Sequence, residues 1–176
     1  MTIFLDVDGV VCDLVGELCR ERGRDPATWP PGVYSLAEVF QVPSEVLWHD
    51  RSEAWWAGLP TLPWASALVT EVERLSSGGR WAFLTAPVRD PRSAAGKLRW
   101  LRARFPTARA FVGAHKELLA SPGCGHLLVD DHDANVEAFQ VAGGLAITWP
   151  ARWNARHAEA ADPWPVVRDE LRRLLV

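Results

Sequence analysis

The sequence predicts a doubly wound α/β sheet that carries a small, mostly helical insert after its first strand. Five short apolar runs alternate along the 176 residues with segments of helical periodicity, which is typical of a parallel sheet with helices on both faces. The gap between the first two runs, from about Cys12 to Gly79, is far longer than one crossover helix needs. The surplus residues of this gap predict the insert.

The five apolar runs are expected to be buried strands, because each is short, continuous and followed by helix or loop residues. They cover residues 2–5, 81–84, 110–112, 126–129 and 145–149. Apolar residues at helical spacing predict helices at 93–105 and 133–141. The pair Asp162 and Pro163 predicts the start of a final helix. Its apolar stripe contains Val166, Val167, Leu171 and Leu174.

The long gap is expected to hold three parts. A helix at 13–22 follows the first strand, a Trp-rich helical segment comes next, and a returning helix at 64–76 leads to the second strand. We therefore divide the chain into a core of residues 1–22 and 64–176 and an insert of residues 23–63. The insert is expected to sit above the sheet as a cap.

Composition and charge restrict the class of protein. The formal net charge of -3 and the absence of a Lys/Arg cluster argue against nucleic acid polymers as partners, but not against small anionic substrates. The N-terminal residues lack a basic segment and a long apolar run, so neither a signal peptide nor a membrane span is expected. Cys12 and Cys19 are expected to be core thiols, and three cysteines do not suggest a disulfide framework. The expected location is the reducing cytoplasm.

Polar side chains follow three of the predicted strands. Asp6 and Asp8 come after the first strand, Thr85 after the second, and Asp130 and Asp131 after the fourth. Ligands of an open parallel sheet bind outside the carboxyl ends of its strands, so these side chains are expected to meet at one edge. Four carboxylates would repel one another without a cation among them, and hard oxygen ligands suit Mg²⁺. The sequence therefore predicts a magnesium site at this edge.

Two aspartates in a DxD pattern can divide two chemical tasks. Asp6 can attack phosphorus and form an aspartyl-phosphate, while Asp8, on the turn that Gly9 permits, protonates the leaving alcohol and later activates water. The Thr85 hydroxyl can donate to a phosphoryl oxygen. Lys116, before the fourth strand, can complete the charge compensation. These residues predict hydrolysis of a phosphate ester.

Each of these residues also has a purely structural interpretation. An Asp-Gly pair is often a turn, an aspartate after the fourth strand can cap the next helix, and Thr85 can simply end its strand. Lys97, on the helix after the second strand, is a second candidate for the phosphate-binding lysine beside Lys116. Its purely structural interpretation is a lysine on the solvated face of that helix. Zinc at Cys124 and His126 is disfavoured, because a second pair at ligand spacing is missing.

The segments DVDGVVCDL, FLTAP and LLVDDHDAN, with a lysine between the last two, resemble in this order the four motifs of the haloacid dehalogenase (HAD) superfamily. The resemblance spans most of the chain. It implies a Rossmann-like core, a phosphorylated intermediate on Asp6, acid/base work by Asp8, and Mg²⁺ held by Asp6, the backbone carbonyl of Asp8, Asp130 and Asp131. The second aspartate of the first motif favours a phosphatase over a dehalogenase.

A closer resemblance is to the 5'(3')-deoxyribonucleotidase family, carried by FLTAPVRD, GKLRWLRARFP, AHKELLASPGCGHLLVDD and EAWWAGLPTLPWA. It implies that Thr85, Ala86 and Lys116 bind the phosphate, with Ala86 where serine is common. It also implies that the insert closes over the nucleotide and that the chain forms a homodimer. Trp55 and Trp56 would stack on a base or anchor the insert. Adjacent helix positions point about 100° apart, so one of the two is expected to face the site.

The expected function is therefore Mg²⁺-dependent hydrolysis of nucleoside monophosphates, preferably deoxyribonucleotides, by a phosphoric monoester hydrolase with an aspartyl-phosphate intermediate. One alternative keeps this chemistry on a sugar phosphate or another small phosphoester. Another is a non-catalytic protein that retains the metal site and binds a partner through its Trp-rich insert. The base, the sugar and the position of the phosphate are left open.

Overall fold

The computed structural model describes residues 1–76 and 80–175 and contains a five-stranded parallel sheet. Its strands are β1 (Ile3–Leu5), β2 (Trp81–Thr85), β3 (Ala110–Val112), β4 (Leu127–Asp130) and β5 (Leu145–Thr148). Their order is β3-β2-β1-β4-β5, and each neighbouring pair is parallel. All five predicted strands are confirmed, with ends that differ from the prediction by no more than one residue. The prediction that all five are buried is wrong for β3 and β5, which are only partly buried because they lie at the two edges of the sheet.

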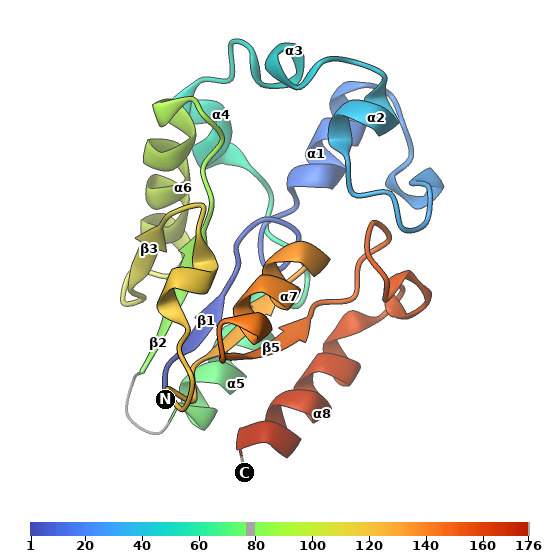
Figure 1. Ribbon diagram of the computed structural model, residues 1–176. Helices are drawn as coiled ribbons and strands as arrows, with labels where there is room; N and C mark the ends of the chain where they lie inside the picture. Colours follow the sequence, from blue (N-terminus) through green and yellow to red (C-terminus); the bar gives the residue numbers. More distant parts are fainter. Residues whose placement is uncertain (77–79, 176) are drawn as a thin grey trace.

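Helices cover both faces of the sheet (Figure 1). They are α1 (Leu14–Glu21), α2 (Leu36–Phe40), α3 (Ser44–Trp48), α4 (Glu53–Gly58), α5 (Ala65–Leu75), α6 (Pro91–Arg104), α7 (Asp133–Val141) and α8 (Pro163–Leu175), with 3₁₀ turns η1 (Pro26–Thr28), η2 (Lys116–Leu119) and η3 (His157–Glu159). One face, with Leu5, packs in the same buried cluster as residues of α5, α6 and α8. The other face, with Phe4 and Leu128, packs against Phe139 of α7. The doubly wound α/β class is confirmed.

Local residues explain where the helices begin. The side chain of Asp13 accepts from the Gly16 N–H at 2.9 Å and caps α1, which satisfies one of the unpaired donors of a helix start. Helix α8 begins at Pro163 as predicted. Its residues Val167 and Leu171 are fully buried, whereas Leu174, predicted on the same stripe, is 42% exposed in the last turn. None of the helices in the described ranges is long and apolar enough to span a bilayer.

The chain between β1 and β2 is helical, as predicted, and α2 and α3 lie beyond the carboxyl ends of the strands (Figure 1). Helix α4 packs closely on α6. The two helices meet at Gly96, where a Cβ atom would overlap the side chain of Trp56. The indole N–H of Trp100 also donates to the Leu59 carbonyl at 2.7 Å. The last part of the insert is therefore held firmly on the core.

Candidate active site

The loop that follows β1 carries both aspartates of the DxD pattern. The backbone N–H of Asp6 donates to the Val129 carbonyl of β4 at 2.9 Å, so this residue is still fixed by the sheet. The chain turns at Gly9, whose φ of +74° suits glycine, and the Gly9 N–H donates to the Cys12 carbonyl at 2.9 Å. A Cβ at Gly9 would overlap the Asp131 carboxylate. The loop therefore lies in contact with the acidic end of β4.

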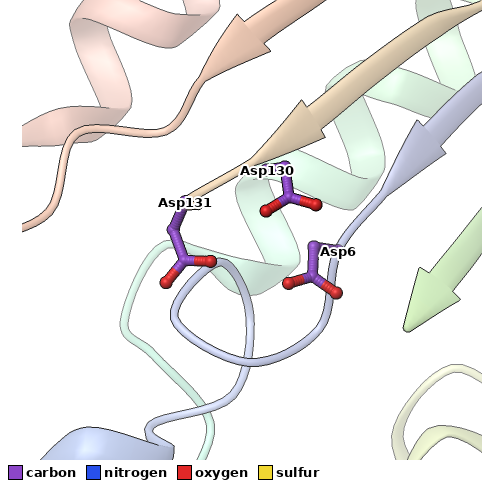
Figure 2. Close-up of side chains that lie close together, drawn as sticks. All are labelled: Asp6, Asp130 and Asp131. Carbon is purple, nitrogen blue, oxygen red and sulfur yellow. The ribbon is translucent and has the colours of Figure 1, made fainter. Parts of the chain in front are cut away.

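Asp6, Asp130 and Asp131 form a buried group of three carboxylates at the carboxyl edge of the sheet (Figure 2). One oxygen of each lies within 4.8 Å of those of the other two. The residues follow the ends of two neighbouring strands, β1 and β4. In the part of the chain that the structure describes, no other group of three or more His, Cys, Asp and Glu side chains is as close.

Lys116 joins two of these carboxylates. It opens η2, is 1% exposed, and its Nζ lies 2.8 Å from Asp6 Oδ1 and 2.6 Å from Asp130 Oδ2. The other oxygen of Asp130 accepts from the His132 N–H at 2.9 Å, and Asn135 Nδ2 lies 3.1 Å and 3.3 Å from the two oxygens. Both oxygens of Asp130 are thus occupied by the protein.

The charges in this group do not balance. Three carboxylates and one lysine leave a formal charge of -2. Burial raises the pKa of Asp131 well above its ordinary value, and the charges of Asp6 and Asp130 add to the rise. Burial also raises the pKa of Asp6 despite the attraction of Lys116. For Lys116, burial opposes the charge, but the two carboxylates outweigh it and raise its pKa. A divalent cation would cancel the remaining charge.

The donor set fits Mg²⁺, which prefers carboxylate oxygens. Lys116 occupies Oδ1 of Asp6 and Trp153 occupies Oδ2 of Asp131, so Asp6 and Asp131 each keep one oxygen with no hydrogen bond to the rest of the described chain. The carboxylate of Asp8 lies outside the three-carboxylate group. The backbone carbonyl of Asp8 as a further ligand stays a prediction.

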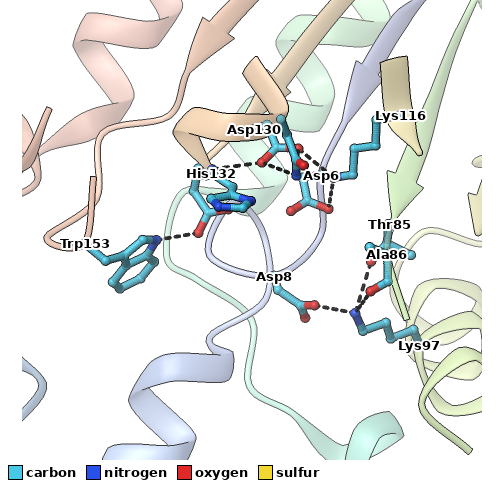
Figure 3. Close-up of polar contacts among 11 residues, drawn as sticks. Asp6, Asp8, Thr85, Ala86, Lys97, Lys116, Asp130, His132 and Trp153 are labelled. Carbon is cyan, nitrogen blue, oxygen red and sulfur yellow. Dashed lines mark hydrogen bonds and ion pairs between the residues drawn. The ribbon is translucent and has the colours of Figure 1, made fainter. Parts of the chain in front are cut away.

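A second lysine lies beside Asp8. Lys97 of α6 is 3% exposed, and its ammonium pairs with Asp8 Oδ2 (Figure 3). It also donates to the Ala86 carbonyl at 2.6 Å and to the Thr85 hydroxyl at 3.3 Å. The interpretation of Lys97 as a solvated residue is therefore wrong. It is buried because α4 covers this face of α6, with the Trp56 ring centre 5.4 Å from Nζ.

The protonation of Asp8 follows from these contacts. Burial raises the pKa of Asp8 even though Lys97 attracts its charge. Its Oδ1 is buried and has no hydrogen-bond partner among the described residues. Because Oδ2 faces Lys97, Oδ1 is the oxygen that can carry a proton in the acid form. A raised pKa keeps that proton in place to higher pH, as a general acid requires.

A cavity of about 230 Å³ adjoins these residues. Its charged wall residues are Asp6, Asp8, Lys97, Lys116 and Asp131, and Ala86 also lines it. Its apolar walls include Leu14, Trp29, Tyr34, Trp48, Trp56 and Trp153. Both the insert and the core therefore contribute to the walls, and the largest wall side chains are aromatic. Thr85 is fully buried behind the cavity and does not line it.

The two adjacent tryptophans of α4 point in different directions, as helix geometry predicts. Trp56 is 1% exposed and lines the cavity. Trp55 does not line it, because its indole N–H donates to Glu21 Oε1 at 2.6 Å and Arg51 covers its ring at 4.3 Å from the centre. The structure thus does not bring Trp55 to the site. Its contact with Glu21 ties α4 to α1.

Several residues that line or support the site are not among those predicted from the sequence. In the loop after β5, Trp153 Nε1 donates to Asp131 Oδ2 at 2.7 Å (Figure 3), and Asn154 Nδ2 donates to the Asp131 carbonyl at 2.9 Å. Tyr34 of the insert stacks on His132, with ring centres 3.7 Å apart. One sign was present, because the segment TWPARWN follows the fifth strand at the same edge as the other motifs.

Comparison with known proteins finds only distant structural neighbours. No known protein family matches the sequence, and no curated protein matches it. A HAD family hydrolase from Deinococcus radiodurans R1, solved with bound phosphate and sodium, is 14% identical over 98% of this chain and 87% of that chain, with a TM-score of 0.48. A HAD family enzyme from Bacteroides thetaiotaomicron, an aspartate-to-alanine mutant in complex with magnesium and inorganic phosphate, is 13% identical over 86% and 94%, with a TM-score of 0.42. Similarity at this level is not sufficient to assign an activity.

Proposed function

We propose that this chain is a magnesium-dependent phosphomonoesterase of the HAD superfamily, with Asp6 as the nucleophile and Asp8 as the general acid and base. The observation that supports it most is the separate pairing of the two aspartates. Lys116 pairs with Asp6, Lys97 pairs with Asp8, and the three-carboxylate group keeps a negative charge for a divalent cation. Pairs of titratable groups in different environments are typical of acid/base and nucleophilic sites. The four motifs add support.

The first step transfers the phosphoryl group to the protein. An oxygen of Asp6 attacks phosphorus, the bond from phosphorus to the ester oxygen breaks, and the ester oxygen takes the proton of Asp8 and leaves as an alcohol. Lys116 and Ala86 line the cavity beside Asp6 and are the phosphate contacts in this proposal. The buried Thr85 hydroxyl does not reach the phosphate in this proposal but accepts a hydrogen bond from Lys97 and so helps to hold that lysine in place.

The second step releases phosphate. Asp8 accepts a proton from a water molecule, the water oxygen attacks phosphorus, and the bond from phosphorus to Asp6 breaks. Inorganic phosphate leaves, and both aspartates return to their starting states. Mg²⁺ held by Asp6, Asp131 and the Asp8 carbonyl would neutralise the phosphoryl oxygens. Asp130, predicted as a further ligand, would add its charge beside the ion, because Lys116, His132 and Asn135 already occupy its oxygens. The residue between the aspartates, Val7, is buried and takes no part.

We propose a nucleoside monophosphate, preferably a deoxyribonucleotide, as the substrate. Aromatic wall residues such as Trp56, Trp48 and Tyr34 suit a flat base, and each base stacked on an aromatic ring contributes about 1 to 3 kcal/mol. Lys97 and Lys116 are the only lysine or arginine side chains among the described wall residues, which favours one phosphate over two. A sugar phosphate would need several polar partners for its hydroxyls, and the walls offer few.

This proposal is tested by measuring phosphate release in the presence of Mg²⁺. The substrates are ribo- and deoxyribonucleoside 5'- and 3'-monophosphates, nucleoside diphosphates and sugar phosphates. One stacking contact of about 1.4 kcal/mol corresponds to about tenfold in kcat/KM, so monophosphates should exceed sugar phosphates by at least that factor. Comparable rates on every ester would defeat the nucleotide assignment and leave a general phosphatase. Inactivity on the whole panel would favour the non-catalytic alternative. Asp6→Asn serves as the inactive control.

A further inference from the structure

Trp153, in the loop after β5, contacts three parts of the molecule at once. Its indole N–H donates to Asp131 Oδ2 at 2.7 Å (Figure 3). Its ring lies against the loop of the nucleophile, because a Cβ at Gly9 would come within 2.9 Å of Trp153 Cζ2. It also packs edge to face on Trp29 of the insert, with ring centres 6.0 Å apart. One side chain thus links the carboxylate group, the DxD loop and the insert.

The backbone that carries Trp153 is held by Asn154, which is 1% exposed. Asn154 Nδ2 donates to the Asp131 carbonyl at 2.9 Å and to the Trp149 carbonyl at 2.8 Å. Its Oδ1 accepts from the Arg156 N–H at 3.0 Å. A buried amide with donors and acceptor satisfied holds its loop in one position. Trp153 is therefore presented to Asp131 from a rigid support.

The insert docks on the same loop. The Gly32 N–H donates to the Arg152 carbonyl at 2.8 Å, one residue before Trp153. Trp29 is 3% exposed, and its own indole N–H donates to the Val33 carbonyl at 2.8 Å, which closes the segment that carries Gly32. If this segment moved away from the core, the Gly32 hydrogen bond would break and Trp29 would no longer cover Trp153.

We propose that Trp153 is a positioning residue that orients Asp131 for the metal ion and couples metal binding to the docking of the insert. This inference rests on the proposed function only in requiring that a divalent cation binds the three carboxylates. Partners that hold a ligating carboxylate fix its orientation and tune metal affinity. Docking of Trp29 and Gly32 restrains Trp153 and so favours the oriented carboxylate. By reciprocity, metal binding favours the docked insert by the same factor.

Calorimetric titration with Mn²⁺ alone, without substrate, tests the positioning role. Trp153→Phe removes the indole donor and keeps a ring against Trp29 and Gly9, and it should weaken Mn²⁺ binding about 10- to 100-fold. Trp100→Phe is the matched control, because it removes an indole hydrogen bond of equal length, 2.7 Å, to the Leu59 carbonyl. That bond lies at the α4 end of the insert, and its loss leaves the contacts of Trp29 and Gly32 with the loop after β5 in place. It should bind Mn²⁺ like the wild type. Equal affinity in wild type and Trp153→Phe overturns the positioning role.

Hydrogen exchange of the insert tests the coupling. Mn²⁺ should slow exchange of the Gly32 amide in the wild type, and this slowing should shrink in Trp153→Phe. Trp29→Leu leaves the bond from Trp153 to Asp131 in place, yet it should also weaken Mn²⁺ binding. If Mn²⁺ does not change the exchange rate of the Gly32 amide in the wild type, the coupling is overturned.

The two proposals fail in different ways. A wild type that binds Mn²⁺ with the expected exchange effect but hydrolyses no ester supports this inference and defeats the proposed function. A wild type that hydrolyses esters while Trp153→Phe binds Mn²⁺ equally well defeats this inference alone. If the wild type binds no divalent cation, both this inference and the magnesium-dependent function are overturned.

Discussion

Replacing Lys116 by methionine should strongly destabilise the metal-free protein. Lys116 is 1% exposed and contacts Asp6 at 2.8 Å and Asp130 at 2.6 Å, and Asp130 is fully buried. Methionine keeps the apolar part of the side chain, so the loss is mainly electrostatic. Removing one partner of a buried ion pair costs about 3 to 5 kcal/mol. Because two carboxylates lose their cation here, we expect about 4 to 5 kcal/mol at neutral pH.

Urea unfolding in metal-free buffer measures this loss. Burial raises the pKa of Asp6 in the wild type, and removal of Lys116 raises it further. The folded variant therefore binds more protons than its unfolded state and gains stability as the pH falls. The loss should be largest near about pH 8 and smaller near about pH 5. Mg²⁺ should restore part of it. A loss under about 1 kcal/mol, or one that grows at acid pH, would refute the role given to Lys116.

Three further predictions concern other parts of the chain. Hydrogen bonds from Arg74 and Arg172 lower the pKa of Glu71 to about 2, so its contribution is present above the unfolded pKa and disappears as the pH falls toward about 2. In thermal unfolding, Arg172→Ala should cost about 0.5 to 1 kcal/mol at neutral pH, since the arginine is half-exposed, and much less near about pH 2. A cost that does not change with pH contradicts this. Backbone N–H donors lower the pKa of Cys124, so this thiol should react first with a disulfide reagent. The buried Cys12 and Cys19 should react only on unfolding. Fast reaction of all three thiols would be inconsistent with the fold. Gly9→Ala should cost more than about 1 to 2 kcal/mol for the left-handed backbone alone and abolish phosphate release; an active, stable variant would exclude the described loop.

The strands and the acidic edge were predictable because they depend on local patterns and one rule of topology. Continuous apolar runs are the mark of strands buried on both faces. Once those strands are parallel, the residues after β1 and β4 must meet, which is why Asp6 and Asp130 were expected together. No long-range contact had to be known for this step.

The burial of Lys97 could not be predicted, because it depends on the docking of α4 against Gly96, about forty positions away in the sequence. The role of Trp153 was hidden for a similar reason. It is one of 10 tryptophans, and only the course of the loop after β5 brings its N–H to Asp131. Side chains selected by tertiary contacts leave no periodic pattern in the sequence.

The central claim is that Asp6 carries the phosphoryl group, and trapping the intermediate tests it most directly. With labelled aryl phosphate and Mg²⁺, the good leaving group needs no acid, so Asp8→Asn should form the intermediate and hydrolyse it slowly. Acid quench and peptide mapping should find up to one hydroxylamine-labile phosphate per chain on Asp6. Asp6→Asn should carry none. Label on another residue, or turnover by Asp6→Asn, would contradict the account.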